Sequence, residues 1–228
     1  MYNIPREASD EFAYQSQART KVAMDNDYFK DELVPVVIKG TKKTPDTIFN
    51  KDEHPRPETT LEGLTKLPPV FKPGGTVTAG NASQINDGAA AVVIMGDDTA
   101  KAMGLKPIAF VRHWAVAGVD PDVMGIGPAA AVPKLLKKTG LTLDKIDLVE
   151  INEAFASQSV YCVNELGLDP AKTNVNGGAI AIGHPLGATG AVLTVKILGE
   201  LKRRGGKRGI VTMCIGGGMG FAYLLEMA

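Results

Sequence analysis

The sequence predicts an α/β protein in which helices cover a layered sheet. After residue 75, short apolar runs with strand character alternate with longer runs of helical spacing, which is the pattern of a layered α/β fold. These 153 residues also hold 22 of the 26 glycines, whereas residues 1–75 hold 23 of the 50 charged residues and 8 of the 14 prolines. We therefore expect a tightly packed α/β core preceded by a solvated, peripheral region.

Length, charge and cysteine content narrow the class of protein further. With 228 residues, 44% hydrophobic and 22% charged, the chain is long enough to bury a core and is not of disordered composition. Its 25 basic and 25 acidic residues remove the electrostatic argument for nucleic acid or an anionic membrane as partner. No apolar run approaches a membrane span, the start lacks the order of a secretory signal, and two cysteines cannot form a disulfide framework. We expect a reduced, cytoplasmic protein.

The first part predicts one long helix and little other regular structure. The pattern favours a helix from Arg6 to Phe29, with residues 9–11 as a capping start. A short strand is expected over Leu33–Ile38. The segment 40–75 is Pro-rich, charged and without period, except for one short helix near Leu61–Leu67. A long irregular stretch in a compact protein is more often a functional loop than a packing element.

The second part alternates between the two kinds of element. The segment 86–94 is apolar and small, and Asp97-Asp98-Thr99 is expected to cap a short helix that ends at Gly104. The remaining pattern predicts strands over 108–117, 148–151, 210–214 and 221–227. It predicts helices over 128–139, ending at Gly140, and over 153–166 and 190–201. The last of these has apolar residues Val192, Val195, Leu198 and Leu201 spaced by three, and Gly205-Gly206 is expected to stop it.

Asn152 is the first residue that could carry chemistry, because it directly follows a predicted strand, where α/β sheets place their sites. Asn is also a preferred helix N-cap, and from residue type alone that structural role is the favoured interpretation.

His184 lies between Gly183 and Pro185 in a run of small residues, so it cannot belong to a regular element. Nearby glycines let backbone approach a ligand closely, and histidine titrates near neutrality, which suits proton transfer or donation to an oxyanion. The alternative is an ordinary surface-loop histidine, which the density of small residues makes less attractive.

Cys214 ends a predicted strand and precedes Gly216-Gly217-Gly218. A glycine run of this kind can form an anion or oxyanion nest, and a cysteine beside it can be a reactive thiolate rather than an inert core residue. A nucleotide loop should be followed by a helix, whereas 221–227 has strand character, which counts against that role.

Other reactive or charged residues are better explained by structural roles. Cys162 lies mid-helix, and we interpret it as core packing. Lys202, Arg203 and Arg204 are the end of a helix, where cations complement the helix dipole. No cluster has the spacing of metal ligands, so no metal is expected.

Together these motifs resemble the thiolases, specifically the acetyl-CoA acetyltransferase branch. The motifs that carry the resemblance are Asn152-Glu153-Ala154-Phe155-Ala156, Gly177 to Pro185, and Cys214 to Gly220, in this order. Residues 76–83, Asn86-Asp87-Gly88-Ala89 and Trp114 to Gly127 also fit the family. The resemblance covers essentially the whole chain, which it places in the C-terminal part of the family's sequence.

The resemblance implies a role for each catalytic candidate. Cys214 would be the acid/base thiolate that removes the α-proton of acetyl-CoA in condensation, or protonates the leaving enolate in thiolysis. His184 would activate the nucleophilic cysteine and help form an oxyanion hole, in which Asn152 would hold a water. The N–H of Gly216 would serve a second oxyanion hole. Claisen chemistry needs such a base and such preorganised donors.

The resemblance also implies a binding channel for the coenzyme A thioester, which is the substrate; no cofactor is implied. The residues expected to line the pantetheine channel are Phe71, Ala79, Gly80, Ser83, Ala154 and Phe155, and Arg56 would approach the CoA nucleotide. The implied fold is the layered αβαβα thiolase arrangement, of which this chain supplies the C-terminal half and part of the loop domain.

The departure from the family is the acylated nucleophile, a second cysteine in an N-terminal half that this chain does not contain. We expect 1–83 to be a partial loop domain at the CoA-binding periphery, 84–105 a segment that returns to the N-terminal-domain sheet, and 106–228 the C-terminal domain. Cys162 cannot replace the nucleophile, so the chain alone should not complete the ping-pong cycle.

Three hypotheses remain from the sequence. The first is the C-terminal subunit of a split acetyl-CoA acetyltransferase, in a hetero-oligomer with an N-terminal subunit that carries the nucleophilic cysteine and acts on acetyl-CoA and acetoacetyl-CoA. The second is a non-catalytic CoA-binding or scaffold remnant, which a Cys214→Ala variant without effect on activity would support. The third is a truncated ordinary thiolase. A neighbouring reading frame that encodes the missing half would favour the first.

Overall fold

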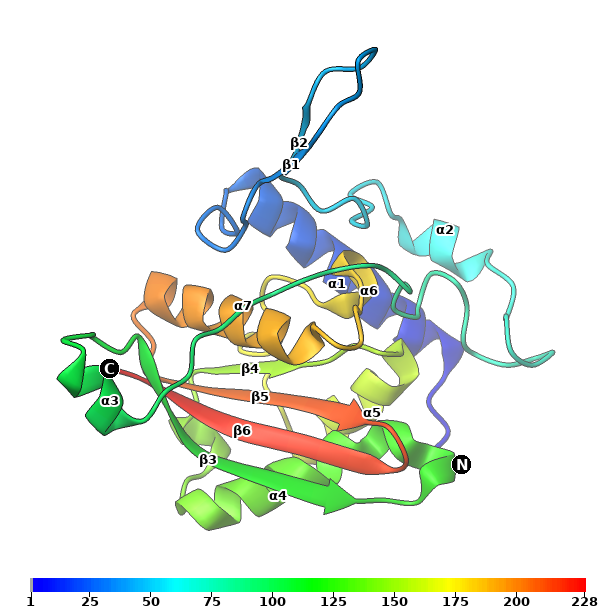
Figure 1. Ribbon diagram of the computed structural model, residues 1–228. Coiled ribbons are helices and arrows are strands. Elements are labelled where there is room, and N and C mark those ends of the chain that lie inside the picture. The colour runs from blue at the N-terminus through cyan, green and yellow to red at the C-terminus, as the bar shows by residue number, and fades with distance from the viewer. Residues whose placement is uncertain (1) are drawn as a thin grey trace.

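A computed structural model describes residues 2–228 (Figure 1). Its centre is a four-stranded sheet in the order β3-β6-β5-β4. The strands are β3 (Ala109–Gly118), β4 (Leu148–Ile151), β5 (Arg208–Ile215) and β6 (Met219–Met227). Strands β3, β6 and β5 are antiparallel neighbours, and β4 runs parallel to β5. This confirms the predicted α/β class with helices on a sheet.

Helices cover both faces of this sheet. On one face, α4 (Gly127–Thr139) and α5 (Ala156–Leu166) pack over a core that contains Val132, Leu135 and Ile210. On the other face lies α7 (Thr189–Arg204), whose Leu193, Ile197 and Leu201 contact Val211 and Leu225. Short 3₁₀ turns, Pro121–Ile126 and Leu143–Lys145, precede α4 and β4. Burial of these aliphatic side chains is the main source of stability of the sheet layer.

In the view of Figure 1, the first part of the chain lies above α7. Helix α1 (Arg6–Asp25) packs against α5, α6 (Ala179–Ile182) and α2 (Leu61–Thr65). Between α1 and α2, the short strands β1 (Val36–Ile38) and β2 (Thr47–Phe49) pair as an exposed hairpin that projects from the body. The predicted strand over Leu33–Ile38 therefore forms only in its second half.

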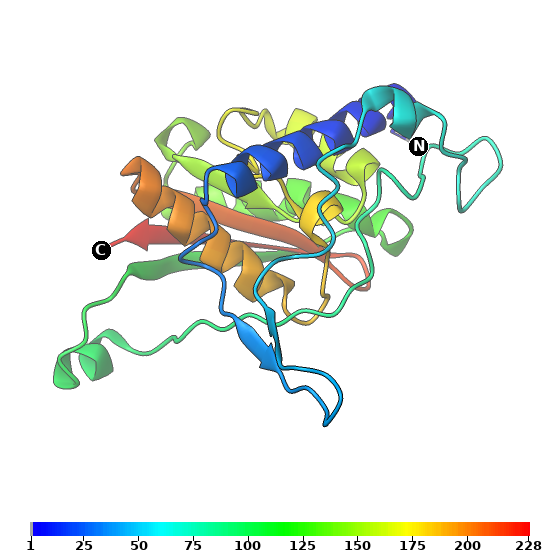
Figure 2. The same cartoon turned by 90° about the horizontal axis from the view of Figure 1, so that it is seen from above.

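Residues 84–96 lie outside helices and strands and form an arm that runs past α7 (Figure 2). The arm leads to α3 (Asp97–Ala102), which sits away from the main body, and then to β3. Helix α3 confirms the predicted short helix, and Gly104 adopts φ +66° behind it. Its N-cap is Gly96 without a side-chain cap, so the predicted capping by Asp97 is wrong.

The predicted start of α1 at Arg6 is confirmed, but its predicted capping residues and the predicted start of α5 are wrong. Helix α1 begins at Arg6 after Pro5, so Ser9 and Asp10 lie inside the helix and are buried rather than capping it. It ends at Asp25 instead of Phe29. Helix α5 begins at Ala156 with Phe155 as its N-cap, not at Glu153. The residues before it, including Ala154, keep an extended backbone, because the Ser83 N–H donates a hydrogen bond to the Ala154 carbonyl at 3.0 Å. Asn152 is therefore not an N-cap.

Of the four apolar residues predicted along α7, only Leu201 is buried. The buried side chains are Leu193, Ile197 and Leu201, spaced by four, together with polar Lys196 and Glu200. The predicted Val195 and Leu198 instead line an open groove. The helix continues to Arg204 and ends at Gly205, whose φ of +66° confirms the glycine stop. Apolar residues thus lie on two sides of α7, and only one side is covered.

A buried charged cluster lies where α7 faces β4. Glu150 of β4 is 3% exposed and Lys196 of α7 is 5% exposed. The carboxyl of Glu32, after α1, lies against Gly199. Burial raises the pKa of Glu150 to about 7, and burial likewise raises the pKa of Glu32 to about 7. The folded chain therefore holds these protons at a pH where an unfolded carboxyl has lost them.

We expect the free energy of unfolding to fall as pH rises from about 5 to about 8. A carboxyl whose folded pKa is raised contributes stability below its unfolded pKa and loses it as pH passes the folded value. Glu150→Gln should reduce this fall in the free energy of unfolding by up to about 3 kcal/mol over the whole range, as measured by urea unfolding. Glu165→Gln, an exposed position on α5, is the matched control and should leave the slope unchanged. An unchanged slope in Glu150→Gln would contradict the assignment.

Candidate active site

The parallel pairing of β4 and β5 brings two candidate residues to one edge of the sheet. Ile151 is in register with Thr212, and the Asn152 N–H donates to the Thr212 carbonyl at 3.0 Å. Asn152 and Cys214 thus lie at the carboxyl ends of neighbouring parallel strands. That edge is where α/β sheets gather functional side chains.

Cys214 is the second-last residue of β5, opposite Gly220 of β6, and a glycine-rich hairpin turn follows the strand. Gly217 and Gly218 have φ of +75° and +82°, which favours glycine at both positions. At Gly216 nothing lies within 4 Å of the place where a Cβ would be, so its surroundings are open. A substrate atom can therefore approach the backbone here, as an oxyanion site at Gly216 requires.

His184 contacts Asn152 across 32 residues of sequence. Its Nε2 lies 3.3 Å from Asn152 Nδ2, and its Nδ1 lies 2.6 Å from Thr189 Oγ1. The Thr189 hydroxyl also lies 3.0 Å from the Pro185 carbonyl, to which it donates. Thr189 Oγ1 is then an acceptor for Nδ1–H, which leaves a lone pair on Nε2 facing the Asn152 amide.

The His184 loop is braced by the base of the arm. The His184 N–H donates to the Gln84 carbonyl at 3.3 Å. Gly183 has φ of +96°, and a Cβ there would lie 2.6 Å from Asn86 Cγ. The positive φ favours glycine at this position, and the missing Cβ leaves room for the Asn86 side chain.

Burial shifts both titratable candidates toward their neutral forms. It lowers the pKa of the half-buried His184 imidazole, and it raises the pKa of the Cys214 thiol. A neutral imidazole can accept a proton, and a protonated thiol can donate one. The pair therefore offers one general base and one general acid at neutral pH.

The two cysteines should differ in reactivity with iodoacetamide. Cys162 is fully buried in α5, where burial raises the pKa of its thiol to about 11, whereas Cys214 is only partly buried. We expect Cys214 to be alkylated first, but at neutral pH more slowly than free glutathione, because its raised pKa lowers the thiolate fraction. Mass spectrometry of native, Cys214→Ser and Cys162→Ser chains measures both rates. Faster labelling of Cys162 would contradict this assignment.

Four of the predicted binding residues come together beside Asn152. Ala82 bridges Phe155, so Ser83 lies alongside Ala154. The rings of Phe71 and Phe155 meet edge-on with centroids 6.1 Å apart, and Phe71 is exposed. These residues form a partly apolar surface that leads toward the end of β4.

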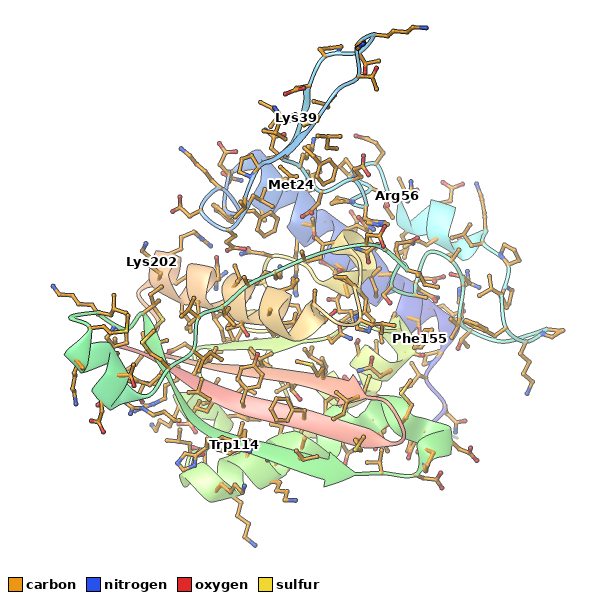
Figure 3. All side chains as sticks on the ribbon, in the orientation of Figure 1. Met24, Lys39, Arg56, Trp114, Phe155 and Lys202 are labelled. Carbon is orange, nitrogen blue, oxygen red and sulfur yellow. The ribbon has the colours of Figure 1, made fainter. Side chains whose placement is uncertain are left out.

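The remaining predicted binding residues are placed less directly. Ala79 is exposed, whereas a Cβ at Gly80 would lie 2.5 Å from Leu64 of α2, so Gly80 allows close packing of its loop. The Arg56 N–H donates to Gln17 of α1, and its side chain is exposed. Figure 3 shows Arg56 beside α1, Phe155 ahead of α5 and Trp114 on β3.

Sequence reasoning missed Thr189 and Glu153. Thr189 Oγ1 accepts a hydrogen bond from the Nδ1–H of His184. The available signal in the sequence was a hydroxyl residue five positions after His184, at the start of a helix. Glu153 is 1% exposed and accepts three hydrogen bonds. A charged residue beside Asn152 was visible, but nothing in the sequence spacing revealed its partners.

Residues 105–227 match the family model "Thiolase, C-terminal domain", and residues 1–98 match "Thiolase, N-terminal domain". The chain belongs to the thiolase family. The second match corrects our expectation that the resemblance lies with the C-terminal part alone.

Curated relatives are named either acetyl-CoA acetyltransferase or 3-ketoacyl-CoA thiolase. An acetyl-CoA acetyltransferase of Syntrophomonas wolfei is 54% identical over 99% of this thiolase chain and 57% of its own length. The mitochondrial 3-ketoacyl-CoA thiolase of Homo sapiens is 52% identical over 99% of this chain and 56% of its own length. The chain therefore spans a little over half the length of these relatives, and the two identities are nearly equal.

Solved structures show the same fold. The crystal structure of the Bacillus anthracis acetyl-CoA acetyltransferase matches with a TM-score of 0.95 and 48% identity, over 100% of this thiolase chain and 57% of that one. Human mitochondrial 3-ketoacyl-CoA thiolase in complex with CoA matches with a TM-score of 0.93 and 51% identity, over 99% and 55%. The layered thiolase fold is thereby confirmed. In residues 2–228, no helix has the length and apolar character to cross a membrane.

Proposed function

We propose that this chain carries the acid/base half of an acetyl-CoA C-acetyltransferase, which cleaves acetoacetyl-CoA by thiolysis and forms it by Claisen condensation. The observation that carries the proposal is the convergence of Asn152, His184 and Cys214. A 3.3 Å contact joins the first two, and the register of β4 and β5 brings the third to the same sheet edge. Family membership and the names of the relatives support this chemistry.

In thiolysis, the nucleophilic cysteine of a thiolase N-terminal portion attacks the β-carbonyl carbon and gives its proton to His184. The bond between this carbon and the α-carbon breaks, the acetyl group stays on the nucleophile, and the departing enolate takes the proton of Cys214. CoA thiol then gives its proton to the Cys214 thiolate and takes the acetyl group, and the nucleophile recovers its proton from His184. The neutral states favoured by burial are the starting states that this sequence needs.

Donors at the site would stabilise the charge that develops on the thioester oxygen. Asn152 is fully buried, and its Oδ1 has no partner within residues 2–228, so it can accept a hydrogen bond from a water. That water and the His184 ring would form one oxyanion hole, and the Gly216 N–H would serve a second. Phe71, Ser83, Ala154 and Phe155 would hold the pantetheine arm.

We infer that activity requires a thiolase N-terminal portion that supplies the nucleophile. Cys162 does not suit this role, because it is fully buried. Beside α7, moreover, the sheet face is open: a groove of about 1680 Å³ runs between Val195 and Leu198 of α7 and the side chains of Trp114 and Phe221. Trp114 is 59% exposed in this groove, and contiguous exposed apolar side chains mark an interaction site.

The arm offers a second docking element for the same portion. Ile85, Val93 and Ile94 are 101%, 87% and 74% exposed. Within the described chain, no backbone group of residues 85–95 makes a hydrogen bond to another backbone segment. An apolar segment with unpaired backbone is suited to pairing with a strand of another sheet.

A chimera tests the proposal. The N-terminal portion of the Syntrophomonas wolfei relative, up to the start of the matched region, is fused to this chain or co-expressed with it. We expect acetoacetyl-CoA thiolysis from the fused and the co-expressed pair, and none from either portion alone. A folded chimera without thiolysis would refute the proposed function, and activity of this chain alone would refute the need for a partner.

A further inference from the structure

The carboxylate of Glu153 lies at the junction of three segments. It is 1% exposed and directly follows Asn152. Its Oε1 accepts from Asn174 Nδ2 at 2.7 Å, and its Oε2 accepts from Ser16 Oγ at 2.6 Å and from the Ile180 N–H at 3.2 Å. Its hydrogen-bond donors thus come from α1, from the loop after α5 and from α6. Three donors offset part of the cost of burying this carboxylate, although burial still raises the pKa of Glu153 above its ordinary value.

The surrounding backbone is shaped to receive this carboxylate. A Cβ at Gly178 would lie 2.6 Å from Glu153 Oε1, so only glycine leaves room for it. The Gly178 N–H donates to Ser16 Oγ at 3.0 Å, and this hydroxyl in turn donates to Glu153. Ser16 therefore links the carboxylate to the start of α6 through a second path.

Asn174 ties the same junction to the end of β4. It has φ of +45°, which asparagine tolerates better than most residues. Its Oδ1 accepts from the Ile151 N–H, and its Nδ2 donates to the Ile151 carbonyl, both at 2.8 Å. The same Nδ2 donates to Glu153, so the backbone on one side of Asn152 and the side chain on the other meet at Asn174.

We propose that Glu153 is a positioning residue that holds the Asn152 end of β4 and the His184 loop at a fixed separation. Its peptide neighbour is Asn152, and its Ile180 contact holds the helix that leads through Gly183 to His184. The Glu153 carboxylate therefore connects the segments that carry Asn152 and His184, whose Nδ2 and Nε2 atoms lie 3.3 Å apart. The catalytic part of this inference rests on the proposed function; the geometric part does not.

Glutamine at this position would fit by shape but not by hydrogen bonding. Both carboxylate oxygens accept hydrogen bonds, so an amide nitrogen in either place would face a donor. One contact must then break, and a buried donor loses its partner. The α6 segment is free to move relative to Asn152, and displacement of a catalytic group by about 1 Å costs up to about a hundredfold in rate.

Two matched pairs of variants separate positioning from general stability. Glu153→Gln is paired with Glu150→Gln, a substitution of the same kind at another buried position near the same strand end. Ser16→Ala is paired with Ser9→Ala on the same helix, since Ser9 is equally buried but donates to Pro5 rather than to the junction. Thermal unfolding of all four shows how much stability each loses.

The direct readout is the His184 imidazole resonance in the 228-residue chain, which needs no turnover. The chain has three histidines, so His184→Ala assigns the signal. We expect Glu153→Gln to shift it strongly and Ser16→Ala to shift it in the same direction by less, while Glu150→Gln and Ser9→Ala leave it in place. In the chimera, Glu153→Gln should lower kcat about ten- to a hundredfold with KM unchanged.

Two results would overturn the positioning role: an unmoved His184 signal in both junction variants, or equal shifts in their controls. If Glu153→Gln does not fold, the Ser16→Ala and Ser9→Ala pair decides the question alone. If instead the native chimera lacks thiolysis while the His184 signal responds as expected, the proposed function fails and the positioning stands.

Discussion

Replacing Cys214 by serine is expected to lower kcat of acetoacetyl-CoA thiolysis in the chimera by about 10²- to 10⁴-fold, the range that a positioned general acid or base contributes. Serine keeps the shape of the side chain, but its hydroxyl is a far weaker acid than a thiol. The departing enolate would then leave without its proton donor. Steady-state kinetics of native and variant chimeras measure the loss.

Cys162→Ser is the control for the Cys214 variant. Cys162 is fully buried in α5, and its Sγ lies 3.7 Å from the Gly125 carbonyl, so it serves packing rather than chemistry. We expect its variant to keep kcat and lose only some stability. Near-native turnover by Cys214→Ser would remove Cys214 from the mechanism, and a large loss in Cys162→Ser would show that the wrong cysteine had been assigned.

Replacing His184 by alanine is expected to lower kcat by about 10²- to 10³-fold, as removal of one oxyanion-hole donor does. The variant would also lose the base that accepts the proton of the nucleophilic cysteine. His184→Asn keeps a donor but no basic nitrogen, so the difference between the two variants separates donation from proton transfer. Both are measured in the chimera over a range of pH.

The control for this prediction is His113→Ala, because His113 lies exposed on β3, outside the site. It should keep native kcat. Since burial lowers the pKa of His184, activity in the native chimera should persist at a pH where an ordinary histidine is already partly protonated. Full activity of His184→Ala would exclude the oxyanion role.

Local signals predicted much of the fold. Glycines at 140 and 205 predicted helix ends, and both adopt left-handed φ of +67° and +66°. The strand character of 221–227 predicted β6, which excludes a helix after the glycine run and with it a nucleotide loop. These features depend on a few neighbouring residues, which is why sequence alone was sufficient.

Features that depend on distant partners were not predictable. Helix α5 begins at Ala156 because Ala82 and Ser83 hold the preceding residues extended. The buried face of α7 follows from how the helix sits on β4 and β5, and its apolar residues on the open side misled the periodicity argument. Tertiary packing overrides local pattern in both cases.

The site shows the same division. Cys214, His184 and Asn152 were identifiable because each sits at a strand end or in a glycine-rich turn. Their closeness in the folded chain could not be predicted, because it depends on the parallel pairing of β4 with β5 and on the hydrogen bonds of Glu153. The spacing of residues in the sequence reveals neither the register of a parallel strand pair nor the three hydrogen-bond donors that meet at one carboxylate.

Deuterium exchange into the acetyl methyl group of acetyl-CoA tests the central claim most directly, since it isolates proton transfer at the α-carbon from the rest of the cycle. In D₂O, the native chimera should incorporate deuterium, detectable by mass spectrometry, and Cys214→Ser should not, while Cys162→Ser incorporates it at the native rate. Exchange that persists undiminished in Cys214→Ser would contradict the assignment of this chain as the acid/base half of a thiolase.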